Sequence, residues 1–209
     1  MKSANIIVAY FYGANPQLAL LRHYQREVYG QEYALTLACE TRWGTQYNVL
    51  AHLKYSKDAL KAFARDISNK CDPTVLEPVN KYAFWAGVDE LLDILKPIHE
   101  AQIASESSSA HLGYVKNRWS QIKETLKYHN ASYDLLSVFK ARRAVQLLPI
   151  HLVVFHLDPK NVHQAFNMGE QTTVFKFIKM HTSSEQYIRI QRDFLNFKRM
   201  REGFDSSKL

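Results

Sequence analysis

Arg42 and Trp43 are the residues whose types and placement best suit chemistry. A flat indole can stack on a nucleic-acid base while a neighbouring guanidinium reaches a phosphate. Gly44 and Thr45 come next and suit the turn and N-cap of a helix that starts near Gln46, so the pair falls on the entering loop. The alternative interpretation is structural, with Trp43 as a core anchor and Arg42 as the cap of a neighbouring helix.

Histidine and cysteine offer a second kind of chemistry, metal binding. His151 and His156 are five residues apart, which does not place both on one helix face. Cys39 and Cys71 have no paired Cys or His at the spacing of a zinc finger. We therefore expect no metal site and no cofactor, and we expect the nine histidines to be surface or satisfied core residues. Two cysteines make no disulfide framework, so a reducing compartment is the default.

Four motifs follow one another along residues 5 to 165. Tyr29-Gly30 precedes Thr41-Arg42-Trp43-Gly44-Thr45, and the run from His151 to Lys160 ends in Leu-Asp-Pro-Lys. Between them lie two helical patterns, from Phe84-Trp85 to Ile98 and from Val115 to Trp119. In this order the motifs resemble the helical insertion region of the hAT-type transposases, whose catalytic core is ribonuclease-H-like.

The resemblance carries an implication about catalysis. The family holds two metal ions with two Asp and one Glu on its core, and these residues flank the insertion region. We expect this triad to lie outside the chain, which also lacks the alternating runs that predict a core sheet. Asp158, within Leu-Asp-Pro, suits helix capping. No catalytic residue is therefore expected and the chain is not predicted to be an enzyme. By the resemblance, Trp43 matches a tryptophan associated with stabilising a flipped base, and Arg42 is its neighbour.

The elements that position these residues are predicted to be helices throughout, because the long apolar stripes repeat every 3.6 residues. The fold class expected is all-α, a multi-helix bundle resembling the insertion domain of a hAT-type transposase. The clearest stripe predicts one helix from Gln46 to about Asn69, with a basic opposite side that is either solvated or placed along a phosphate backbone. Trp85 and Trp119 are expected in the core. Other helices are predicted over 17–29, from before Phe84 through Pro97, over 112–126, over 135–148 and over 187–197.

The stretch from His151 to Leu157 is helix or strand by periodicity, and the resemblance favours helix. Asp158-Pro159 is predicted to end it and to start a helix toward Phe166. The Ser-rich residues 105–109 are predicted to be a loop, and Met168-Gly169 to separate the last part of the chain. We expect a helical domain with the Thr-Arg-Trp motif over 1–165 and a basic helical segment over 166–209.

The composition limits the classes of partner. The formal charge is +7 and the isoelectric point is near 9.3, which is compatible with nucleic acid. No apolar run approaches the ~18 residues that span a bilayer, and Met1 to Phe11 has no cleavage-type ending, so neither a membrane partner nor a signal peptide is expected.

Two functions remain open. The first is a transposon-derived, catalytically inactive fragment that is similar to a hAT transposase and binds DNA in the nucleus, or elsewhere in the cell if the source is not eukaryotic. Its partners would be DNA, further copies of itself or a full-length transposase. The alternative is a helical protein–protein interaction module without nucleic-acid binding. Salt-dependent binding of DNA distinguishes them.

Overall fold

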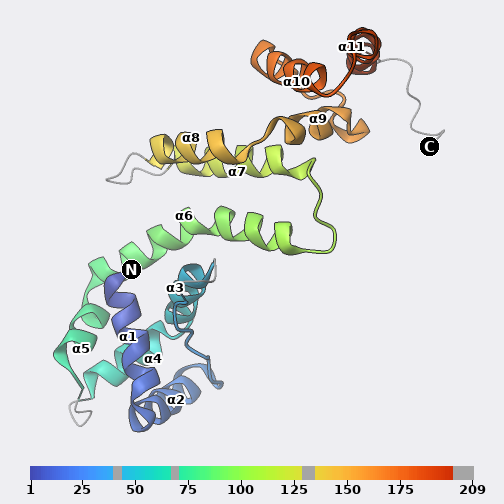
Figure 1. Cartoon of the computed structure of the whole chain (residues 1–209). Helices are drawn as coiled ribbons and strands as arrows, with labels where there is room; N and C mark the ends of the chain where they lie inside the picture. The colour runs from blue at the N-terminus through green and yellow to red at the C-terminus, as the bar shows by residue number, and fades with distance from the viewer. Residues whose placement is uncertain (40–43, 67–70, 129–134, 200–209) are drawn as a thin grey trace. The chain divides into compact units, whose positions relative to one another are not determined.

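The protein is all-α, as the periodicity predicts (Figure 1). The computed structural model describes residues 1–39, 44–66, 71–128 and 135–199, and these ranges contain eleven α-helices, one 3-10 helix and no strand. The first six helices are α1 (Lys2–Gly13), α2 (Asn15–Tyr29), α3 (Thr45–Tyr55), α4 (Lys57–Arg65), α5 (Pro73–Asn80) and α6 (Tyr82–Glu106). The remaining elements are α7 (Tyr114–Lys127), α8 (Leu135–Gln146), α9 (Pro149–Leu157), η1 (Pro159–Asn161), α10 (Met168–Met180) and α11 (Ser184–Arg199).

The chain divides into two compact units, which we call unit 1 (Met1–Ile103) and unit 2 (Ala104–Leu209). The sequence places a division at 165/166 because the motif resemblance ends there. In the structure α10 and α11 both pack against α9, so these two helices belong to the same unit as α7, α8 and α9. None of the described helices is both long and apolar enough to cross a membrane.

The core of unit 1 is formed by apolar side chains from its six helices. The rings of Phe11 and Phe63 meet edge to face with their centroids 5.2 Å apart, which joins α1 to α4. Trp85 is buried, and its Nε1 donates a hydrogen bond of 2.7 Å to the carbonyl of Val79. The prediction of Trp85 as a core residue is confirmed. Other buried residues of this core are Ile7, Val8, Leu21, Val49, Leu50, Leu53, Leu60, Val75 and Val88.

The single helix predicted from Gln46 to about Asn69 is wrong, because Ser56 separates α3 from α4. Ser56 is fully buried, and its hydroxyl accepts a hydrogen bond of 2.9 Å from Nε2 of Gln25 on α2. The apolar stripe continues across the break because both helices face the same core. The last residues of the predicted helix, 67–69, lie outside the described residues.

Unit 2 has a smaller apolar core between α9, α10 and α11. Its buried residues are Leu152, Val174, Phe175, Ile178 and Phe194. The rings of Phe175 and Phe194 meet edge to face at 5.7 Å, and Phe166 stacks on Phe194 at 5.3 Å. On α7, Trp119 is half-buried and meets Phe139 of α8 edge to face at 5.3 Å, so the ring packs inside the unit as expected.

Residues 149–169 contain α9, η1 and the start of α10. The apolar run from His151 lies in helix α9, which begins at Pro149. Asp158-Pro159 starts only the short η1, not a helix that reaches Phe166. Met168-Gly169 does not separate elements, because Asn167 caps α10 with a side chain that accepts a hydrogen bond from the Glu170 amide, and the helix begins at Met168.

Candidate nucleic-acid interface

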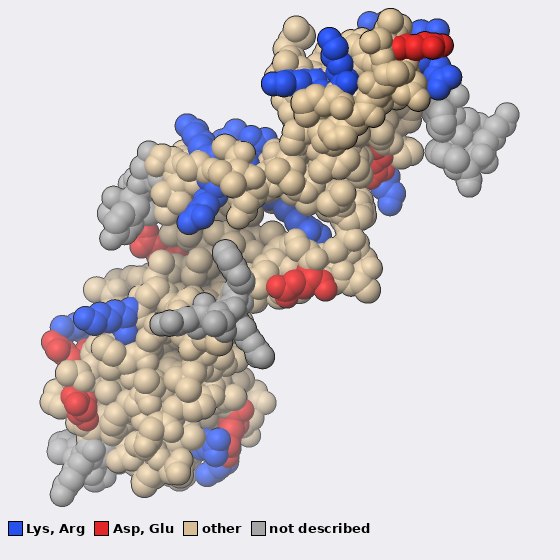
Figure 2. Space-filling model, viewed as in Figure 1, with Lys and Arg blue, Asp and Glu red and all other residues tan. Residues whose placement is uncertain are grey.

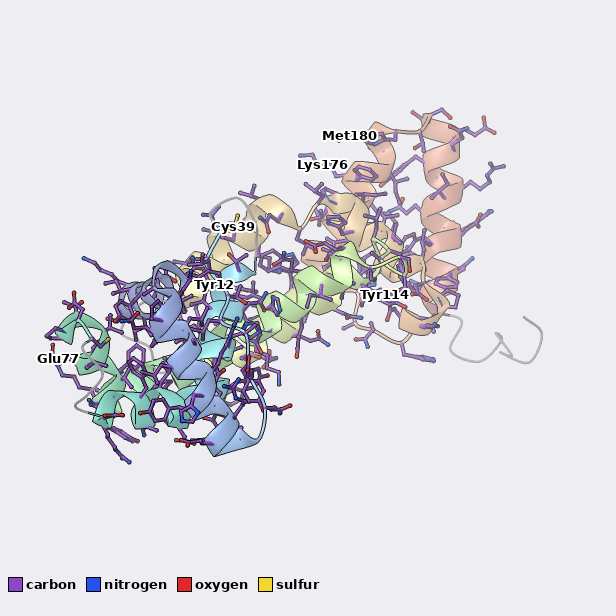
Figure 3. All side chains as sticks on the ribbon, turned by 90° about the horizontal axis from the view of Figure 1, so that it is seen from below. Tyr12, Cys39, Glu77, Tyr114, Lys176 and Met180 are labelled. Atoms are coloured by element: carbon purple, nitrogen blue, oxygen red, sulfur yellow. The ribbon has the colours of Figure 1, made fainter. Side chains whose placement is uncertain are left out.

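Arg42 and Trp43, the two predicted site residues, lie outside the described residues. Among the described residues, Cys39 precedes this pair and Thr45 follows it, and these two residues are hydrogen-bonded to each other. The Thr45 hydroxyl donates to the carbonyl of Cys39 at 3.0 Å and accepts from the Cys39 amide at 3.2 Å. Cys39 is therefore held beside Thr45 at the start of α3 (Figure 3 labels Cys39).

Gly44 makes the turn into α3, as predicted, with φ of 78°, but it is also the N-cap residue in place of Thr45. The turn is packed closely against α6. A Cβ at position 44 would stand 2.8 Å from Nδ1 of His99 and 2.9 Å from Oε1 of Gln102. One turn into α3, Tyr47 stacks on the His99 ring with 4.4 Å between centroids. Glycine is therefore required here both by its backbone conformation and by the space available.

The predicted basic side of residues 46–69 is used partly inside unit 1. Nζ of Lys54 lies 2.6 Å from a carboxylate oxygen of Asp89, and Nζ of Lys57 lies 5.3 Å from the centre of the Trp85 ring. These contacts tie α3 and α4 to α6, which favours a structural role for the two lysines over contact with a phosphate backbone.

The positive charge of the protein resides in unit 2. Unit 1 has 11 Lys and Arg against 11 Asp and Glu, whereas unit 2 has 16 against nine. The formal charge of +7 is thus the charge of unit 2 alone, and unit 1 is neutral. Electrostatic attraction between the protein and a polyanion acts over about one Debye length, ~8 Å. A positive charge concentrated in one unit therefore attracts a polyanion more strongly than the same charge distributed over the whole protein.

Most of the described cations of unit 2 are not held in an ion pair. Among the described residues, ion pairs hold Lys116, Lys127 and Arg192. Nine other cations form no ion pair with any described residue. They are Lys123, Lys140, Arg142, Arg143, Lys160, Lys176, Lys179, Arg189 and Arg199. Figure 2 shows Lys and Arg side chains gathered over α8 and over α10 and α11. These cations remain available to an anionic partner.

A groove of about 520 Å³ opens beside α10 and adds to this basic region. It lies between the start of α9, at Pro149, and the α10 residues Thr172, Thr173, Lys176, Phe177 and Met180. Figure 3 labels Lys176 and Met180 on α10. The lysine gives the groove a positive charge, and the two threonine side chains already donate to helix carbonyls.

A buried polar cluster joins the helices that carry these cations. His156 of α9 is fully buried, and its Nε2 lies 2.9 Å from Oε2 of Glu170 on α10. The other carboxylate oxygen of Glu170 lies 2.8 Å from Nζ of Lys116 on α7. Lys116 and Glu170 each expose only 14% of their side chains, so the pair is shielded from water. We call Lys116, His156 and Glu170 the buried triad.

The environment of His156 favours the neutral ring. Burial and the charge of Lys116 lower the pKa of His156 from 6.5 to about 4, against the opposing influence of Glu170. Nδ1 of His156 has no hydrogen-bond partner among the described residues. A buried donor without a partner is costly, so the proton belongs on Nε2, where it is donated to Glu170, and Nδ1 carries only a lone pair.

Lys198 of α11 is hydrogen-bonded to the segment that follows α9. Its Nζ donates to the carbonyls of Asn161 at 2.9 Å and Gln164 at 3.1 Å. Burial and the nearby charge of Lys116 lower the pKa of Lys198. This lysine therefore faces the interior of unit 2, although it lies in the most basic stretch of the sequence.

The sequence did not identify the buried triad as a unit. It leaves His156 as either a surface or a satisfied core residue, because its partners stand 40 and 14 residues away and carry no motif. The described residues contain no group of three or more His, Cys, Asp and Glu able to hold a metal ion, and no disulfide joins Cys39 to Cys71. Comparison with protein-family models, with curated proteins and with solved structures found no match to this chain.

Proposed function

We propose that this chain is a non-catalytic, hAT-transposase-like DNA-binding protein in which unit 2 holds the phosphate backbone. The observation that carries the proposal is the confinement of the charge excess to unit 2. Lysine and arginine side chains that are not neutralised internally release counterions from DNA when they meet phosphates, and this release drives non-specific binding. The Thr-Arg-Trp motif supports the same class of partner through Arg42 and Trp43.

The proposal is tested with the full chain and a fluorescent duplex of random sequence, titrated between 50 and about 200 mM salt. Affinity should fall linearly with salt on logarithmic axes, with a slope of about −0.9 for each phosphate contacted. The double variant Lys140→Glu and Arg142→Glu, at two exposed positions of α8, should reduce the size of that slope by about two.

A matched control makes the same charge change in unit 1. Lys2 and Lys96 are exposed, and Lys2→Glu with Lys96→Glu should leave the slope close to that of the unaltered protein. Equal losses in both double variants would show that binding does not depend on unit 2. A protein that does not bind the duplex at 50 mM salt would contradict the proposal, and so would metal-dependent strand cleavage that survives rigorous purification.

The competing candidate, a protein–protein interaction module, is supported by two exposed apolar residues of α8. Val138 and Val145 are 58% and 75% exposed and lie two turns apart on this helix. Exposed apolar side chains clustered on one helix suit contact with another protein. If the chain self-associates or binds protein and shows no salt-dependent affinity for DNA, this second function is the correct one.

A further inference from the structure

The outer face of α11 carries three arginines together with an exposed isoleucine and an exposed asparagine. Seen down the helix, one side carries residues that are all exposed: Glu185, Ile188, Arg189, Arg192, Asn196 and Arg199. Their spacings of three and four residues place them on a single face. The opposite side, with Tyr187, Ile190 and Phe194, packs into the core of unit 2. Figure 3 shows α11 lengthwise, with nitrogen-ended side chains projecting from it.

The side chains on this outer face have few competing partners. Arg189, Asn196 and Arg199 make no ion pair or hydrogen bond with another described residue. Arg192 uses Nε to reach the adjacent Asp193 at 3.2 Å, in an exposed pair. Exposed pairs of this kind contribute little, so the guanidinium of Arg192 can exchange Asp193 for a stronger partner.

A short turn connects α10 to α11. Three residues, His181, Thr182 and Ser183, join α10 to α11. In Figure 1 α11 is seen along its axis while α10 runs across the view, so the two helices cross. Together with α9 they enclose one apolar core. Two crossing helices with a turn of this length are the arrangement in which a second helix can be laid into the DNA major groove.

We propose that α11 reads base sequence in the major groove of duplex DNA, with Arg189, Arg192 and Asn196 as its base-contacting residues. The inference rests on the proposed DNA binding by unit 2 and adds specificity to it. Arginine pairs through two hydrogen bonds with the O6 and N7 atoms of guanine, and asparagine pairs with N6 and N7 of adenine. Ile188, which is 68% exposed, suits contact with a thymine methyl group.

The dimensions of the helix fit this role. The stretch of base-contacting residues, from Ile188 to Asn196, rises about 12 Å at ~1.5 Å per residue. That length covers about four base pairs at ~3.4 Å each. The major groove, about 12 Å wide, admits an α-helix, whereas the deep and narrow major groove of duplex RNA does not. The outer face should therefore recognise a site of about four base pairs rich in guanine and adenine on one strand.

The test selects bound sequences from a library of random DNA duplexes with the full chain. The unaltered protein should enrich a short motif that contains guanine. Arg189→Lys keeps the charge but loses the planar two-bond fork, so preference at one guanine position should fall by about 5- to 150-fold while the salt slope stays the same. Asn196→Ala should lose preference at an adenine position instead.

The matched control is Arg65→Lys on α4, which makes the same exchange at an exposed site in unit 1. It should leave the enriched motif unchanged. Salt-dependent binding without any enriched motif would overturn this inference and leave the proposed function intact. A motif that survives Arg189→Lys and Asn196→Ala together, or equal affinity for duplex RNA, would also overturn it. A complete lack of DNA binding would remove both proposals.

Discussion

Protonation of His156 should destabilise unit 2 at mildly acidic pH. The pKa of this histidine falls from 6.5 to about 4 on folding, because the ring is buried beside Lys116. The folded state therefore favours the neutral ring, and the stability that this gives is complete above about pH 6.5. It is lost as the pH falls from about 6.5 toward 4, where the folded protein also takes up the proton.

The size of the loss follows from the shift. A difference of one pKa unit corresponds to about 1.4 kcal/mol, so the free energy of unfolding should fall by up to about 3 kcal/mol across this range. His156→Gln keeps a side chain that can donate to Glu170 but does not titrate. The difference in unfolding free energy between the unaltered protein and this variant should therefore change by about 3 kcal/mol between pH 7 and pH 4.

The assay is urea unfolding at a series of pH values, with hydrogen exchange at the amides of α9 and α10 to assign the effect to unit 2. His163→Gln, at an exposed position, controls for the general effect of removing a histidine. A difference between the unaltered protein and His156→Gln that stays constant from pH 7 to pH 4 would refute the reasoning. So would an equal pH effect in His163→Gln.

Two further predictions concern the Thr-Arg-Trp segment. If Trp43 stacks on a flipped base, Trp43→Ala should lower the preference for a hairpin with an unpaired base by about 5- to 150-fold. If it is a core anchor, the same change should lower the free energy of unfolding by ~3–5 kcal/mol with no separate effect on DNA, so both quantities are measured on one variant. Gly44→Ala should be more destabilising in urea unfolding than Gly30→Ala. Both glycines have positive φ, but a Cβ meets His99 only at position 44 and nothing within 4 Å at position 30; equal losses would contradict the steric argument.

The sequence predicts the helices well where a local signal marks their ends. Gly30 ends α2 with φ of 72° and donates its amide to the Arg26 carbonyl, as a glycine after an apolar stripe indicates. The apolar stripe does not indicate the break at Ser56, because it continues on both sides of this residue. The partner of Ser56 is Gln25, 31 residues earlier, and a long-range hydrogen bond leaves no periodic trace in the sequence.

The functional surfaces show the same limit. The basic character of residues 184–199 is plain in the sequence, but the roles of its cations are not. Lys198 turns inward to backbone carbonyls, while Arg189 and Arg199 remain exposed. Periodicity assigns each residue to a face, yet only the packed structure shows that the polar atom of Lys198 finds carbonyls inside the unit.

The buried triad restricts how this protein can change over evolution. Removing one partner of a buried ion pair costs about 3–5 kcal/mol, whereas replacing the whole group with apolar side chains is often neutral. A typical domain has only about 5–15 kcal/mol of stability, so each single substitution at Lys116, His156 or Glu170 takes a large part of that margin. Lineages that descend from this sequence should keep all three residues or lose them together, and intermediates with one or two should be rare.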